Sequence, residues 1–336
     1  MVEGSALAQN EIALRDFYIQ HMTLPRIPLN STVYKPHGAY EWKIKEEYEL
    51  LWEKPLGKQL CIFDLDNRPF EQEGEIFGPK TLSWTDNPVD MHGLSLGVLQ
   101  HWLYAKIHGY KYYYVRTGEF EDRRASWKKP SVLGQILKKH QTCVYMDSDA
   151  IFNHIDLPLE WLMNYWNIDK NNNSVALAMD PKAEHNVDKQ GKLYDNTGFM
   201  IVQNRPVTFN MMDDWSVCAD EGGKHPDCVE YRTVAFGRPS DQGGFGNFIR
   251  YDYKDHVKEL PCSEANGFPE DRSECIGTFI KHLWSGKNEL IKIAIGEQLP
   301  GKFLEIFHKQ MMREKDDFYL TEEHLMSDAW LKERVR

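Results

Sequence analysis

The chain has 336 residues, of which 41% are hydrophobic and 27% are charged, a balance typical of a globular protein with a substantial core. Its net charge of −11 excludes the overall basic field that attracts nucleic acid or an anionic membrane. The sequence contains no run of 18 or more apolar residues and no charged-then-apolar N-terminal signal. We therefore expect membrane attachment only through an anchor that this chain lacks.

The sequence pattern divides the chain into three parts. Residues 1–57 are polar and interrupted by prolines, which predicts an N-terminal helical arm with helices around 12–21 and 42–53. Residues 58–290 alternate β-prone and helical segments and form the expected main domain. The charged and helix-prone residues 291–336 predict a C-terminal helical extension over the outside.

Strands and helices alternate along the main domain. Strands are expected at 60–63, 81–84, 110–115, 143–146, 174–179 and 198–203, and helices at 96–107, 130–137 and 206–220. Gly109 suits the end of the first helix and Pro130 the start of the second, because glycine tolerates a left-handed cap and proline the first helical turn. This order predicts an α/β fold with a mostly parallel central sheet flanked by helices.

Two aspartates follow a buried strand in the stretch VYMDSDAIF, residues 144–152. Asp147 and Asp149 stand where open α/β sheets gather their ligands, at the carboxyl ends of the strands. Two such carboxylates suit a hard divalent cation that holds a phosphate-bearing substrate. The residues alone are equally compatible with a solvated turn.

A similar stretch, CIFDLDNRPF at 61–70, contains Asp64 and Asp66. It resembles the opening of haloacid-dehalogenase-type phosphatases, in which the first aspartate is the nucleophile and the second an acid/base. That motif needs a hydroxyl residue two positions after the second aspartate, where this chain has Arg68. We therefore prefer a strand-end turn here and keep the phosphatase as an alternative function.

The six cysteines fall unevenly along the chain. Cys61 and Cys143 each lie in an apolar, strand-like run, which predicts buried thiols. Two other pairs lie in loop-rich sequence and can form disulfides: Cys218 with Cys228, and Cys262 with Cys275. Together with sequons at Asn30 and Asn172, such disulfides favour the Golgi or secretory lumen. A cytoplasmic location stays open because no signal or transmembrane segment is present.

Six segments, in order along the chain, resemble glycosyltransferase family 34, the galactosyl-, mannosyl- and xylosyltransferases of fungi and plants. They are HWLYAKIHGYKYYYV (101–115), RRASWKKPSVLGQIL (123–137), VYMDSDAIF (144–152), DNTGFMIVQN (195–204), DQGGFG (241–246) and IKHLWSGK (280–287). The resemblance covers roughly residues 80–290 and departs from the family where DQGGFG is rich in glycine. It implies a divergent, fungal-like member with the GT-A fold, whose nucleotide-sugar half extends to about residue 152 and precedes an acceptor half.

The resemblance implies a retaining transfer of a hexose or pentose from a nucleoside-diphosphate sugar to a glycan, a small molecule or another hydroxyl acceptor. A UDP-sugar is favoured over GDP-mannose as donor, with Mn²⁺ or Mg²⁺ as cofactor. The implied metal ligands are Asp147, Asp149 and His282. Ser148 would lie against the ribose, and Lys128 and Lys287 would lie near the phosphates. Lys129 is interchangeable with Lys128 on the sequence alone.

The remaining implied residues surround the sugar. Asp241 and Gln242 take the catalytic positions beside the reaction centre, and Asp180 and Asn196 bind hydroxyls of the donor sugar or the acceptor. Read without the resemblance, Asp241 suits a helix cap equally well, and Asn196 suits the turn before Gly198. A GT-A-like protein that binds a nucleotide sugar or a carbohydrate without turnover is the non-catalytic alternative.

Overall fold

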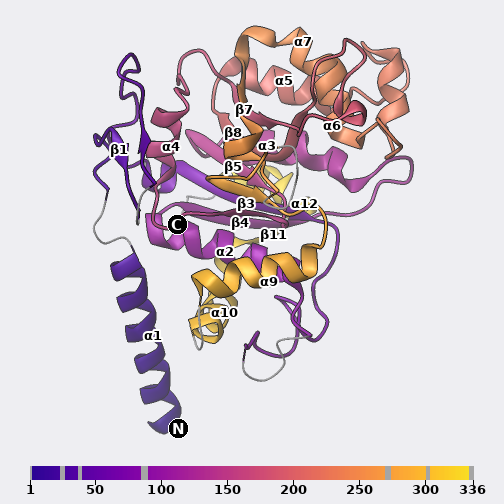
Figure 1. The fold of residues 1–336 in the computed structure, drawn as a ribbon. Coiled ribbons are helices and arrows are strands. Elements are labelled where there is room, and N and C mark those ends of the chain that lie inside the picture. The colour runs from indigo at the N-terminus through magenta and orange to yellow at the C-terminus, as the bar shows by residue number, and fades with distance from the viewer. Residues whose placement is uncertain are drawn as a thin grey trace.

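The structure, a computed structural model, describes residues 2–22, 27–36, 40–84, 90–268, 274–299 and 303–332. A seven-stranded sheet with the order β11-β4-β3-β5-β8-β7-β9 forms its centre (Figure 1). The strands are β3 Leu60–Asp66, β4 Lys111–Arg116, β5 Thr142–Met146, β7 Val175–Met179, β8 Asp195–Gln203, β9 Val257–Leu260 and β11 Tyr319–Thr321. Neighbours run parallel except where β8 pairs with β5 and β7. The predicted α/β fold with a mostly parallel sheet is confirmed.

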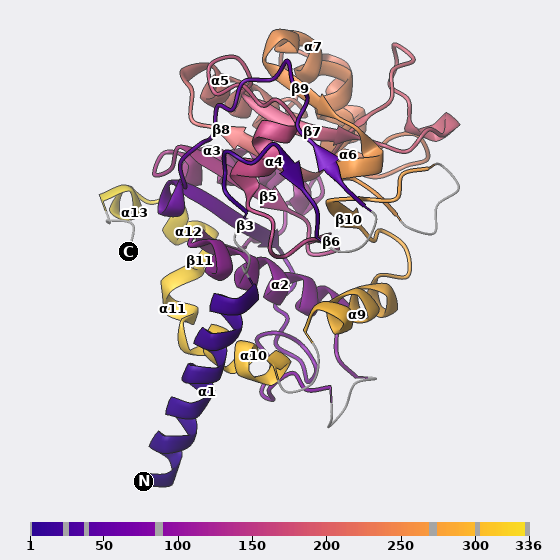
Figure 2. The same ribbon diagram turned by 60° about the vertical axis from the view of Figure 1, so that its left-hand side comes forward.

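Helices cover both faces of this sheet (Figure 2). One face packs against α2 Gly93–His108, which in turn contacts α9 Lys287–Gln298 and α10 Phe303–Arg313. The other face packs against α3 Lys129–Leu137 and α5 Pro206–Ser216. Residues of one strand alternate between the two cores, and because both faces are covered these strands are apolar almost without interruption.

The other elements lie around this framework. The remaining helices are α1 Val2–Met22, α4 Leu159–Tyr165, α6 Ser240–Gly244, α7 Arg250–Asp252, α8 Cys262–Ala265, α11 Lys315–Phe318, α12 Glu322–Leu325 and α13 Asp328–Lys332. Two small sheets pair β1 Val33–Tyr34 with β2 Trp42–Lys43, and β6 Ala150–Phe152 with β10 Ile280–His282. Along the described residues no helix is both long and apolar enough to cross a membrane.

Two predicted elements are wrong. The expected helix at 42–53 is β2 followed by turns, because Trp52 is anchored away from its neighbours: its indole donates to Ile168 O at 2.8 Å and its backbone N–H to the Asn164 side chain. The expected strand at 81–84 does not form. Leu82 N–H donates to the His308 imidazole at 2.7 Å instead of to a sheet neighbour.

The C-terminal region contributes a strand as well as the expected helices. β11 adds to the edge of the sheet in parallel with β4, pairing Leu320 with Val115. Tyr18 of α1 packs against Phe303 and Phe307 of α10, with ring centroids 4.6 and 4.9 Å apart. The two ends of the chain therefore share a core with the central sheet.

The disulfides correct one prediction and confirm another. Cys61 and Cys143 are disulfide-bonded rather than free buried thiols, because β3 and β5 are neighbouring strands whose register places these two residues side by side. The sequence shows two apolar strands but not their register. The expected bonds Cys218–Cys228 and Cys262–Cys275 are both present.

A glycine fixes α2 against the loop that carries the Asp147–Asp149 pair. A Cβ on Gly97 would overlap the Ser148 carbonyl oxygen, so α2 approaches this loop as closely as its backbone allows. We expect Gly97→Ala to lower the free energy of unfolding by about 1–3 kcal/mol, measured by urea denaturation.

Gly296→Ala in α9 is the matched control. Its Cβ would have ordinary contacts at 3.8 Å from the Trp84 ring, and the change removes a flexible helical glycine. A gain of about 0.5–1 kcal/mol is expected there. Equal effects of the two substitutions would contradict the close approach at Gly97.

Candidate active site

A cavity of about 840 Å³ opens at one edge of the central sheet. β3 and β5 end at this edge, and β8 begins there because it runs antiparallel to β5. Residues from the ends of all three strands therefore line one space. The lining includes Asp66, Arg68, Lys129, Tyr145, Asp147, Ser148, Asp149, Asn196, Thr197, Asp241, Gln242, His282 and Lys287.

Two aspartates and a histidine meet in this cavity. Asp147, Asp149 and His282 each offer a ligand atom, and the three atoms lie within 4.8 Å of one another. β10 pairs antiparallel with β6 so that His282 stands opposite Ala150, the residue after Asp149. Leu283 N–H also donates to Asp149 O at 2.8 Å. Backbone pairing thus brings together two chain segments that are 133 residues apart.

A hydrogen bond to Asn266 orients the His282 ring. Its Nδ1 lies 2.8 Å from Asn266 Oδ1, and the Asn266 amide donates to Asp180 Oδ1 and to Met179 O, so the amide oxygen faces the ring and accepts the Nδ1 proton. The other ring nitrogen, Nε2, faces Asp149 and lies 3.1 Å from its Oδ1. A histidine held in this way presents Nε2 as a ligand atom.

The charged groups in the cavity shift the pKa values of Asp149 and His282. Burial disfavours the charged forms, but the attraction between Asp149 and the cations of His282 and Lys287 outweighs it. The pKa of Asp149 is therefore held well below its usual range, and the pKa of His282 is raised above its usual value. Lys287 Nζ lies 2.5 Å from Asp149 Oδ2, which places this predicted phosphate-binding lysine in the cavity.

Lys129 lies in the cavity, and Lys128 points away from it. The Lys129 ammonium is buried 3.3 Å from Asp147 Oδ1 and 3.5 Å from Asp241 Oδ2, and these two carboxylates raise its pKa against the effect of burial. Lys128 pairs instead with Glu322 at 2.7 Å. Adjacent side chains at the start of α3 point in different directions, and the sequence alone did not decide between them.

The other predicted residues form one hydrogen-bonded network. Asp180 accepts from Asn196 at 2.8 Å and from Gln242 at 2.6 Å, and burial raises its pKa. Asp241 accepts from the Thr197 hydroxyl at 3.1 Å. Asp241 lies in the first turn of α6 and does not cap it, because Pro239 is the N-cap residue. Its carboxylate is engaged within the cavity instead.

Comparison with known proteins finds a family match for the middle part of the chain. Residues 97–252 match the model of the galactosyl transferase GMA12/MNN10 family, glycosyltransferase family 34. This segment resembles that family. The protein is thus a glycosyltransferase, and its central sheet has the α/β arrangement expected from the sequence.

Three solved structures are similar to this glycosyltransferase at low identity. One is a glycosyltransferase involved in the glycosylation of the major capsid of PBCV-1, with 12% identity, coverage of 70% of this chain and 98% of that chain, and a TM-score of 0.49. GlyE of Streptococcus pneumoniae TIGR4 has 11% identity, coverage of 76% and 63%, and a TM-score of 0.43. The galactosyltransferase LgtC, solved with donor and acceptor sugar analogs, has 11% identity, coverage of 74% and 95%, and a TM-score of 0.39. No curated protein matches.

The second Asp-x-Asp stretch contributes to the site of this glycosyltransferase in an unexpected way. Asp64 is buried and bonded to His101 Nδ1 at 2.9 Å, and His101 Nε2 contacts Ala150 O at 2.6 Å, so this pair supports the strand that follows Asp149. Asp66 holds the Arg68 guanidinium through both of its oxygens. Arg68 lines the cavity 3.4 Å from Ser148 Oγ. Sequence reasoning missed this cation, although it follows the strand end directly.

Packing explains the glycine-rich segment DQGGFG, where this glycosyltransferase departs from the pattern of family 34. Side chains at Gly243, Gly244 and Gly246 would collide with the rings of Tyr231, Trp127 and Tyr194, respectively. Large aromatic residues thus occupy the space that bulkier residues at these positions would need. The helix that carries Asp241 and Gln242 is packed closely against them.

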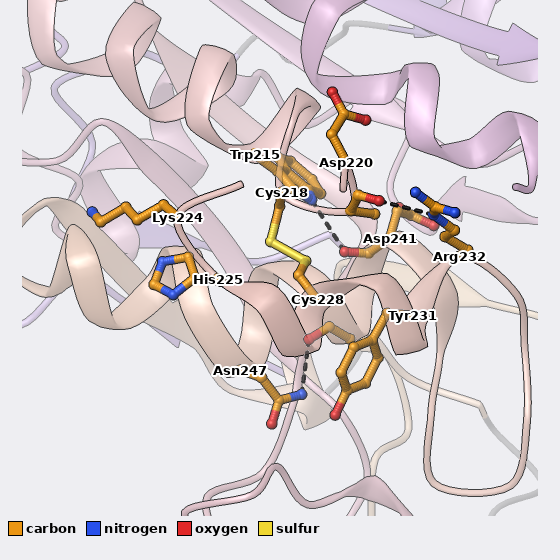
Figure 3. The surroundings of a disulfide bond; sticks show 12 residues. Trp215, Cys218, Asp220, Lys224, His225, Cys228, Tyr231, Arg232, Asp241 and Asn247 are labelled. Atoms are coloured by element: carbon orange, nitrogen blue, oxygen red, sulfur yellow. Dashed lines mark hydrogen bonds between the residues drawn. A yellow bond between two sulfur atoms is a disulfide. The ribbon is translucent and has the colours of Figure 1, made fainter. Parts of the chain in front are cut away.

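A disulfide lies beside the same helix (Figure 3). Cys218, just beyond α5, is bonded to Cys228, whose sulfur would lie 3.3 Å from a Cβ on Gly244. Trp215 donates its indole N–H to Asp241 O at 3.1 Å. The disulfide and this tryptophan together brace the backbone that positions Asp241 at the cavity.

The electrostatic balance of the cavity can be tested in the metal-free glycosyltransferase. We expect His282 to titrate above the ordinary pKa of 6.5, and its pKa to fall in Asp149→Asn, which removes the neighbouring negative charge. Nitrogen-resolved NMR of the histidine rings measures both values. His140, whose pKa burial lowers to about 4, is the internal control and should not change. A His282 pKa below 6.5 in the unchanged protein would contradict the described geometry.

Proposed function

We propose that this glycosyltransferase is metal-dependent and retaining. In this proposal it moves a hexose or pentose from a nucleoside-diphosphate sugar, preferentially a UDP-sugar, to a hydroxyl of a glycan or other acceptor. The observation that carries the proposal is the convergence of Asp147, Asp149 and His282 within 4.8 Å in one cavity.

The residues fit a divalent cation. Two carboxylates and an imidazole supply the oxygen and nitrogen ligands that Mn²⁺ accepts, with Mg²⁺ as the alternative ion. Asn266 fixes the tautomer that leaves Nε2 as the ligand atom. A bound cation would offset the negative charge that develops on the departing nucleoside diphosphate.

Positive side chains support a diphosphate donor in the same cavity. Lys129, Arg68 and Lys287 line it from three different segments of the chain, beside the two aspartates. Lys129 takes the phosphate-binding role that the sequence assigned to Lys128, because only its ammonium lies in the cavity. Ser148, next to Arg68, stays our prediction for contact with the ribose.

Asp241 and Gln242 are the proposed residues beside the reaction centre. The Asp241 carboxylate is paired with Lys129 and hydrogen-bonded to Thr197, which weakens it as a nucleophile. An amide such as Gln242 is a weak nucleophile as well. This favours displacement on one face: the acceptor hydroxyl bonds to the anomeric carbon on the side that the diphosphate leaves, and its proton passes to the leaving phosphate oxygen. Gln242, held by Asp180, would orient the sugar.

The alternatives have less support. A phosphatase nucleophile must reach its substrate, yet Asp64 is 1% exposed and is engaged by His101 and Tyr112. A binding protein without turnover does not account for the match to a family of transferases. Three disulfides are typical of lumenal or secreted proteins, and within that class we propose the Golgi.

Removal of one aspartate tests the proposed metal site. We expect Asp149→Ala to reduce Mn²⁺-dependent hydrolysis of UDP-sugars, assayed without acceptor, by about 100-fold or more, because the leaving diphosphate loses its cation. Asp255→Ala, an exposed aspartate outside the cavity, is the matched control and should keep full activity. Full activity in Asp149→Ala with loss in Asp64→Asn would point to phosphatase chemistry instead.

The raised pKa of His282 predicts how metal affinity depends on pH. A protonated imidazole cannot bind a metal, so Mn²⁺ competes with a proton at Nε2. Below the His282 pKa, affinity should fall by about tenfold per pH unit as the pH decreases, and above it affinity should level off. Calorimetric titration of Mn²⁺ between about pH 8 and pH 6 measures this. An affinity independent of pH would show that His282 is not a ligand.

A further inference from the structure

A second cavity, of about 460 Å³, adjoins the first. Its lining includes Asp180, Lys182, His185, Asn186, Asn196 and Trp284. Asn196 lines both cavities, so the two spaces border on the same side chain. The volume lies within the range of small-molecule sites. The transferase chemistry proposed above needs only the first cavity for its donor.

The side chain that borders both cavities is next to the proposed metal ligands. A Cβ on Gly198 would lie 2.8 Å from Asn196 Oδ1 and 2.9 Å from Asp147 Oδ2, and it would collide with the His282 ring. These three side chains therefore surround a single point. A molecule that reaches Asn196 from the second cavity approaches a donor sugar held in the first.

The floor of the second cavity is polar and fixed in place. Asp180 accepts hydrogen bonds from Asn196, Asn266 and Gln242, so both of its oxygens have partners before any ligand binds. Gln242 is also the residue that we place beside the reaction centre. A preformed carboxylate and amide pair of this kind suits hydroxyl groups, which both donate and accept hydrogen bonds.

One wall of the cavity is aromatic. Trp284 is half-buried, with Phe268 5.2 Å away and the His282 ring 5.5 Å away, measured between ring centroids. A broad ring beside fixed polar groups matches a pyranose, which has an apolar C–H face and a rim of hydroxyls. Among the described lining residues the charges are those of Asp180 and Lys182, so the cavity lacks the cluster of cations that a phosphate requires.

An exposed aromatic lies at the side of this cavity. Phe236, at the tip of the turn closed by the bridge between Ala235 and Arg238, is 88% exposed. Its ring lies 5.4 Å from that of His185, which lines the second cavity, while Val234, just before the turn, lines the first. The turn therefore extends an aromatic surface outward from the cavity, where a longer glycan would continue.

We propose that the second cavity binds the terminal saccharide of the acceptor. The sugar ring lies on Trp284, and its attacking hydroxyl passes Asn196 into the first cavity. The inference rests on the proposed function and deepens it, because it commits the acceptor to a neutral glycan. Trp284 then determines acceptor binding and contributes nothing to donor binding.

Glycan-array binding of the labelled, multivalent protein loaded with UDP and Mn²⁺ tests this proposal. We expect the unchanged protein to bind a defined set of neutral glycans. Trp284→Ala should lose about tenfold or more of that signal, and Trp284→Phe should recover most of it because a flat ring remains. Phe236→Ala should weaken only longer glycans. Trp84→Phe, in a half-buried tryptophan that lines neither cavity, is the control and should bind normally.

Thermal-shift titration of UDP with Mn²⁺ on each variant separates the two proposals. Unchanged UDP binding in Trp284→Ala together with loss of glycan binding supports the second cavity as the acceptor site. Undiminished glycan binding in that variant, or no glycan bound by the unchanged protein, overturns the inference and leaves the donor site standing. Failure of the unchanged protein to bind either UDP or GDP in the presence of Mn²⁺ would overturn the proposed function itself.

Discussion

The close approach of β8 to the turn after β5 is the constraint on which the site depends. β8 is the strand that reverses the sheet, and it begins at the edge where β3 and β5 end. Asp147 N–H donates to Gly198 O at 2.7 Å, and the missing side chain of Gly198 leaves room for His282 and Asn196. Because Gly198 has no Cβ at this backbone contact, the Asp147 carboxylate, the Asn196 amide and the His282 imidazole can all lie beside it.

Burial of so much charge is tolerated because the opposite signs are paired. Lys129 lies between Asp147 and Asp241, and Asp149 lies between His282 and Lys287. An unpaired buried charge costs several kcal/mol, so the buried groups depend on their partners remaining in place: Lys129, Asp149, Asp241 and His282. The pairing with His282 and Lys287 holds the pKa of Asp149 well below its usual range and so keeps this carboxylate ionised for a cation. Stability and the proposed chemistry thus rest on the same contacts.

The surroundings of the site are built for rigidity. Aromatic rings fill the space over Gly243 and Gly244, and the Cys218–Cys228 disulfide lies beside them (Figure 3). Behind the metal-binding candidates, Asn266 connects His282 to Asp180 and so to the second cavity. Because the floor of that cavity shares its hydrogen bonds with the first, donor and acceptor sites would be held in a fixed relation.

The sequence by itself determined the alternation of strands and helices, the Asp147–Asp149 pair at a strand end, and the ordered segments that resemble family 34. Such features are local, since periodicity and spacing are visible in one dimension. Only the tertiary structure decided that Cys61 is bonded to Cys143, that Lys129 rather than Lys128 enters the cavity, and that Arg68 lines it. These outcomes depend on strand register and on side-chain direction at helix and strand ends, which are set by packing between segments far apart in the chain.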